Sequence, residues 1–79
     1  MPTIFEIFGL RFYFYSDEHL PIHVHIENSD GKAKVNIEPE IELISNRGIK
    51  PKDIKKALVL IETYKEEIIE AWSKYHGEN

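Results

Sequence analysis

Three of the four histidines in this chain, His19, His23 and His25, fall within a stretch of seven residues. Imidazole exchanges protons near neutral pH and is the commonest metal ligand in proteins. His23 and His25 are two residues apart where apolar and polar residues alternate, so a β-strand would project both side chains from one face. We therefore expect any chemistry of the chain at this cluster, as either proton transfer or metal binding.

Two neighbouring imidazoles can act as general acid and general base, which is one way to cleave RNA through its 2′-hydroxyl. In this interpretation His23 and His25 transfer protons, while His19 assists or orients them. Arg11 or Arg47 would then stabilise the phosphate. In a metal-dependent alternative, the three histidines bind zinc and leave a fourth position open. A simpler alternative is that the histidines are solvated or pair with nearby carboxylates.

Two tyrosines and a lysine are expected beside the histidines. Tyr13 and Tyr15 alternate with apolar residues, and Lys34 does so in a later segment. If the apolar side chains are covered, all three emerge with His23 and His25 on the opposite sheet face. There they would contact a substrate, because sheet-face aromatics stack on RNA bases. They would equally suit a protein interface, in which tyrosine is enriched.

The elements that must position these residues follow from periodicity. Alternation predicts three strands, at residues 10–15, 22–27 and 32–38, or four if residues 3–8 form an edge strand. Pro39 interrupts the third strand, and Ile41 and Leu43 could form a short continuation of it. Turns are expected at residues 28–31 and 45–48. From Pro51 to about residue 76, apolar residues recur at helical spacing, which predicts one long helix, with a bend near Tyr64 as the alternative.

The predicted fold class is therefore α+β. We expect a single domain of residues 1–79, with a small antiparallel sheet of three to four strands and a long C-terminal helix packed on one face. A core this small is marginally stable alone, so a homo-oligomer or a complex with a partner protein is expected.

The composition of the chain excludes some classes of protein and makes others less suitable. The chain has no cysteine, which excludes disulfides and thiolate zinc sites. Its formal net charge of −4 argues against non-specific nucleic-acid binding, although residues 47–56 are locally basic. The N-terminus lacks the basic region of a signal peptide, and no apolar run approaches the length of a membrane span. We expect a soluble cytoplasmic protein with no membrane partner.

Several short motifs also resemble a known family. They are MPTIF and IFG within residues 1–9, RF and FYS within 11–16, HxPxHVH at 19–25, NRG at 46–48 and EAW at 70–72. Together they resemble domain of unknown function 4160, a family of small bacterial proteins. The matching polar and glycine residues are Arg11, Tyr15, His19, His23, His25, Glu42, Arg47 and Gly48.

This resemblance implies a toxin of a type II toxin–antitoxin pair, because some family members are regarded as such toxins. The partner would be a small antitoxin-like protein encoded nearby. RNA as the substrate is suggested by the histidine cluster, because the resemblance does not by itself show nuclease activity. The resemblance gives no settled mechanism, and the cofactor stays unknown, with none or zinc as the alternatives. The alternative is a non-enzymatic binding module, in which the histidine and tyrosine face is the interface for the partner protein.

Overall fold

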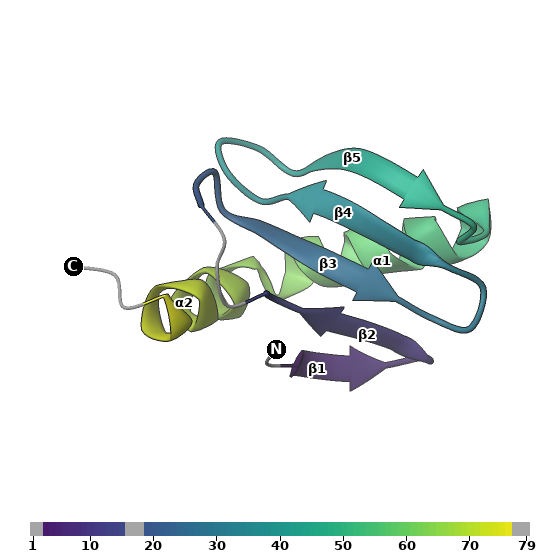
Figure 1. Ribbon diagram of the computed structural model, residues 1–79, viewed down its shortest axis with the longest axis horizontal. Coiled ribbons are helices and arrows are strands. Elements are labelled where there is room, and N and C mark those ends of the chain that lie inside the picture. The colour runs from purple at the N-terminus through teal and green to yellow at the C-terminus, as the bar shows by residue number, and fades with distance from the viewer. Residues whose placement is uncertain (1–2, 16–18, 77–79) are drawn as a thin grey trace.

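The computed structural model describes residues 3–15 and 19–76. Five strands form one antiparallel sheet in the order of the sequence: β1 (Thr3–Ile7), β2 (Leu10–Tyr13), β3 (His23–Glu27), β4 (Lys32–Asn36) and β5 (Glu42–Arg47). Two helices, α1 (Pro51–Thr63) and α2 (Lys65–Tyr75), follow the sheet and cover one of its faces (Figure 1). The predicted α+β class with an antiparallel sheet is confirmed.

The predicted number of strands is too low. β1 forms the optional edge strand, and β5 forms where the sequence predicts a turn at residues 45–48. The side chain of Asn46 explains the difference, because it bonds both the N–H and the carbonyl of Ile49 and so moves the turn beyond the strand. All six residues of β5 are exposed. An exposed edge strand lacks the alternation by which buried strands are recognised.

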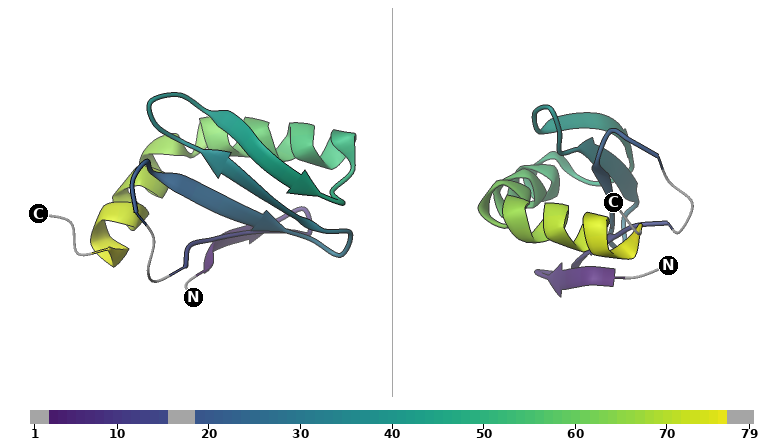
Figure 2. Two further views of the ribbon diagram at one scale, coloured as in Figure 1. Left: turned by 45° about the horizontal axis from the view of Figure 1, so that its top comes forward. Right: turned by 90° about the vertical axis from the view of Figure 1, so that its left-hand side faces the viewer.

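The prediction of a single long helix is also wrong, because the helix is interrupted at Tyr64, where the alternative predicted only a bend. Tyr64 has φ −108° and ψ 24°, outside the helical region, and ends α1 by donating its N–H to Leu60. The break allows α1 to follow the sheet while α2 turns across its end (Figure 2). Tyr64, although it continues the apolar stripe of the sequence, is 37% exposed, whereas Trp72 on α2 is buried in the core.

The core lies between the sheet and the helices. Phe12, Val24 and Val35 on the central strands are fully buried, and Ala57, Ile61 and Ile68 meet them from the helices. This agrees with the alternation in the sequence, which places the apolar residues of each strand on one face. In the described ranges, no helix is long and apolar enough to span a bilayer.

Gly31 holds the hairpin between β3 and β4 against the end of β5. A Cβ atom at Gly31 would lie 1.9 Å from the carbonyl oxygen of Arg47, which is backbone and cannot move aside cheaply. We expect Gly31→Ala to lower the free energy of unfolding by about 1–3 kcal/mol, as overpacking does. Urea denaturation would measure the loss. Ser29→Ala, at an exposed position of the same turn, is the control and should leave stability nearly unchanged.

Candidate functional site

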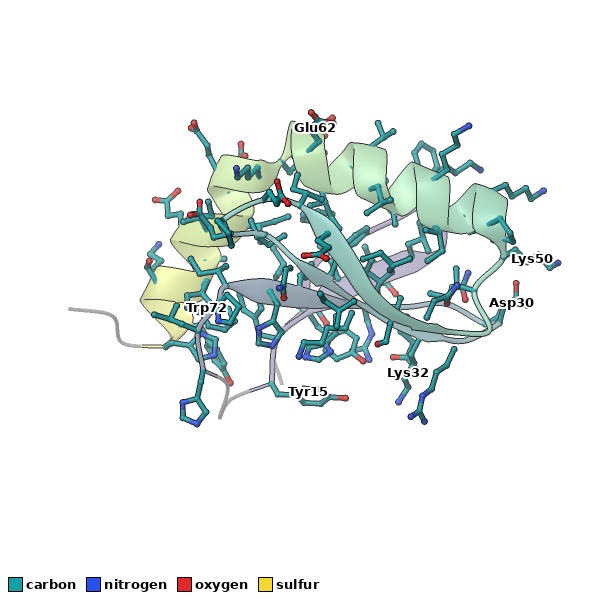
Figure 3. All side chains as sticks on the ribbon, turned by 90° about the horizontal axis from the view of Figure 1, so that it is seen from above. Tyr15, Asp30, Lys32, Lys50, Glu62 and Trp72 are labelled. Carbon is teal, nitrogen blue, oxygen red and sulfur yellow. The ribbon has the colours of Figure 1, made fainter. Side chains whose placement is uncertain are left out.

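The sheet face turned away from α1 and α2, here called the outer sheet face, carries the predicted site. Strand pairing arranges its polar side chains in cross-strand rows. The first row runs through Arg11, Glu27, Lys32 and Arg47, the second through Tyr13, His25, Lys34 and Ser45, and the third through His23, Asn36 and Glu42. Figure 3 shows Tyr15 and Lys32 on the side of the sheet away from α1.

His25 lies in the middle of this face, in a groove of about 330 Å³ that we call the His25 groove. Its lining comes from four neighbouring segments and comprises Tyr13, Tyr15, His25, Lys32, Ala33, Lys34, Ser45 and Arg47. The His25 ring stacks on Tyr13, with centroids 5.5 Å apart, and meets Tyr15 edge-on at 4.6 Å. The groove therefore combines a half-buried imidazole, two phenols and three cationic side chains.

Tyr13 is only 1% exposed, although the alternation predicts it on an open face. Its outer surface is covered by the guanidinium of Arg11, 4.5 Å from the ring centroid, and by Tyr15 at 5.5 Å. Burial, reinforced by a hydrogen bond with Tyr15, raises the pKa of the Tyr13 phenol. Tyr13 is thus a rigid, neutral support beneath His25, while the 41% exposed Tyr15 is the aromatic residue that a ligand can reach.

The raised pKa of Tyr13 predicts a pH dependence at the alkaline end. The unfolded chain loses the phenolic proton near its ordinary pKa of about 10, before the folded chain does. The stability associated with Tyr13 is therefore complete below about pH 10 and is lost as pH rises further. We expect the phenolate absorbance to show one tyrosine ionising after the others. Tyr13→Phe should remove this late step, and Tyr64→Phe should retain it.

Arg11 and Arg47, both predicted to stabilise a phosphate, have different surroundings. Arg11 donates to Glu27 at 2.5 Å; this bond raises the pKa of Arg11 and lowers that of Glu27. Its charge is therefore already offset. Within residues 3–15 and 19–76, by contrast, no carboxylate forms an ion pair with Arg47 or Lys34. Lys32 lies opposite Glu27, and its charge helps to lower the pKa of that carboxyl. Lys34 and Arg47 are thus better placed for an external anion than Arg11.

His23 differs from His25 in burial and in hydrogen bonding. It is 6% exposed, and its Nδ1–H donates to the carbonyl of Pro21 at 2.8 Å. Its ring centroid lies 5.3 Å from that of His25 and 5.1 Å from that of Trp72. One edge of His23 reaches a neighbouring groove of about 440 Å³, which also contains the exposed His19. Lys34 lines both grooves, whereas His19 lines only the neighbouring one of the two.

The zinc alternative gains no support from this arrangement. In the part of the chain that the structure describes, no group of three or more His, Cys, Asp or Glu side chains is placed to bind a metal ion. His19, His23 and His25 are instead distributed over two grooves and a buried position.

The sequence analysis did not predict that the end of α2 contacts this site through His76. His76, at the C-terminal end of α2, faces carbonyl oxygens with both ring nitrogens, of Trp72 at 3.0 Å and of Tyr15 at 3.2 Å. Carbonyls only accept, so both bonds form together only when both nitrogens carry protons. Its ring also packs on Trp72 at 4.0 Å. The spacing of four between Trp72 and His76 was the available signal, since such residues share one helix face.

The fold and the site define a small α+β domain in which one sheet face packs against helices and the other presents an imidazole among aromatic and cationic side chains. The chain belongs to the family described as Domain of unknown function (DUF4160), whose model matches residues 9–73. The matched region contains every residue of the three cross-strand rows. No curated protein and no solved structure matches the chain.

Proposed function

We propose that the chain binds RNA across the outer sheet face and acts there as the toxin of a type II toxin–antitoxin pair. The observation that supports this most directly is the composition of the His25 groove. An imidazole, an exposed tyrosine and three cations converge in one groove of a chain whose formal net charge is −4. Two of these cations, Lys34 and Arg47, form no ion pair among the described residues.

RNA has the chemistry to use each part of this groove. Unstacked bases pack on aromatic side chains, a role for Tyr15, and phosphates attract cations, a role for Lys34 and Arg47. His25 would take the proton from a 2′-hydroxyl, whose oxygen attacks the adjacent phosphorus. The P–O5′ bond breaks, a cyclic phosphate forms, and the 5′-oxygen leaves with a proton supplied by His23. Lys34 and Arg47 would stabilise the charge that develops on the phosphate.

The burial of His23 favours a second candidate, the non-enzymatic binding module. An imidazole that is 6% exposed and donates to Pro21 performs a structural task. The outer sheet face would then present one accessible imidazole with Tyr15, which suits an interface with a partner protein.

Induced expression in a bacterial host, with purified protein assayed in parallel on a 5′-labelled single-stranded RNA, tests the proposal. The proposal expects growth arrest, saturable RNA binding and fragments ending in a cyclic phosphate. Unimpaired growth together with intact RNA across a range of pH would overturn it and leave the binding module. Binding and arrest without cleavage would retain the RNA-binding toxin and remove the role of His25 in catalysis.

A further inference from the structure

A second groove, here called the lysine-rimmed groove, lies on the helix side of the molecule. It is formed between the turn that joins β1 to β2 and the exposed side of α1, and its volume is about 420 Å³. It is lined by Phe8, Lys52, Lys55, Lys56, Val59 and Leu60. The outer sheet face shares none of these residues, so the groove is independent of the function proposed above.

Phe8 is the unusual residue of this groove. It has φ 55° and precedes Gly9 with φ 76°, which makes a two-residue hairpin turn with positive φ at both positions. Such turns favour asparagine, aspartate or glycine, and a bulky side chain in this region is strained. The ring is 71% exposed, so burial in this chain does not offset the strain. Folding alone does not account for a phenylalanine here, which points to a contact outside the chain.

The charge and polarity around Phe8 define what it would contact. The Nζ atom of Lys56 lies 5.7 Å from the centroid of the Phe8 ring, and Lys52 and Lys55 complete a cationic rim. No carboxylate is among the described side chains that line the groove. The floor is apolar, because it consists of Phe8, Leu60 and Val59, which is 58% exposed.

We propose that the lysine-rimmed groove docks an acidic segment of a partner protein that inserts an apolar side chain between Phe8 and Val59. Carboxylates of the segment would pair with the lysine rim, and the apolar side chain would cover the floor. A phosphate backbone would find no polar partner on this floor. A lipid surface is flat and would leave the hollow unfilled. An amphipathic acidic peptide satisfies both the floor and the rim.

The test uses a fluorescein-labelled synthetic helix of roughly 14 residues, about the length of α1, with leucines along one face and glutamates along the other. Fluorescence anisotropy should show saturable binding that weakens with salt. Phe8→Asn should weaken binding by about tenfold, as removal of an interface anchor does. Because asparagine suits the turn, this variant should be at least as thermally stable as the wild-type protein, which separates a docking defect from a folding defect.

A second experiment compares the peptide binding of two double variants in which positive charges are reversed. Lys52→Glu with Lys56→Glu should weaken peptide binding by about tenfold or more and remove most of its salt dependence. Lys34→Glu with Arg47→Glu changes the net charge equally on the outer sheet face and should leave peptide binding unchanged. Equal affinity for wild-type protein and Phe8→Asn would overturn the proposal. So would absence of saturable peptide binding, including the case in which phosphatidylglycerol vesicles bind instead.

Discussion

His25→Gln should reduce the rate of RNA cleavage by about 10²- to 10⁴-fold, because general acid–base catalysis contributes on this scale. His25 is the imidazole that opens into the groove containing Lys34, Arg47 and Tyr15. Glutamine retains a polar side chain of similar reach but cannot exchange a proton near neutral pH. Single-turnover cleavage of a labelled RNA, with binding measured separately, would show whether the decrease is in the chemical step.

His19→Gln is the matched control for this prediction. His19 is exposed and lies in the neighbouring groove, which shares Lys34 with the His25 groove. We expect its replacement to change the cleavage rate by less than about threefold, the range of a surface histidine outside the site. A decrease in His19→Gln equal to that in His25→Gln would contradict a site centred on the His25 groove. In cells, His25→Gln should relieve growth arrest while remaining soluble and folded.

The fold could be predicted where alternation and periodicity are strong. The strands around Phe12, Val24 and Val35 bury one face, and that face generates the alternation. β5 could be predicted only in part, as the short continuation at Ile41 and Leu43, because all of its residues are exposed and its pairing with β4 depends on tertiary structure. The break at Tyr64 could be predicted only as an alternative, because the apolar stripe continues past it while the axis of the helix changes.

The candidate site was predictable in its residue types and less so in its geometry. Alternate residues of a strand project from the same face, which correctly placed His23 and His25 together. The register of β3 and β4 then brings Lys34 opposite His25. The alternation of a strand does not show how far a neighbouring helix or strand covers a side chain. Trp72 on α2 and the ring of His25 enclose His23, so two residues with equal sequence signals have different exposure.

The cations of the outer sheet face should determine RNA affinity. Lys34→Glu with Arg47→Glu should weaken binding of single-stranded RNA on the order of 100-fold at moderate salt, because two side chains that attract phosphates are replaced by two that repel them. The slope of log affinity against log salt concentration should decrease in magnitude by about one to two units, since a protein that neutralises fewer phosphates releases fewer counterions. Nitrocellulose filter binding over a series of salt concentrations measures both quantities.

Lys52→Glu with Lys56→Glu is the matched control for this second prediction. Each replacement of Lys or Arg by Glu lowers the formal net charge by two units. Either double variant therefore changes the net charge from −4 to −8. If RNA is attracted only by the net charge of the molecule, the affinities of the two double variants should fall equally. If it is held in the His25 groove, only the affinity of Lys34→Glu with Arg47→Glu should fall. Equal decreases would therefore contradict an RNA site on the outer sheet face, because the two lysines of α1 lie on the other side of the sheet.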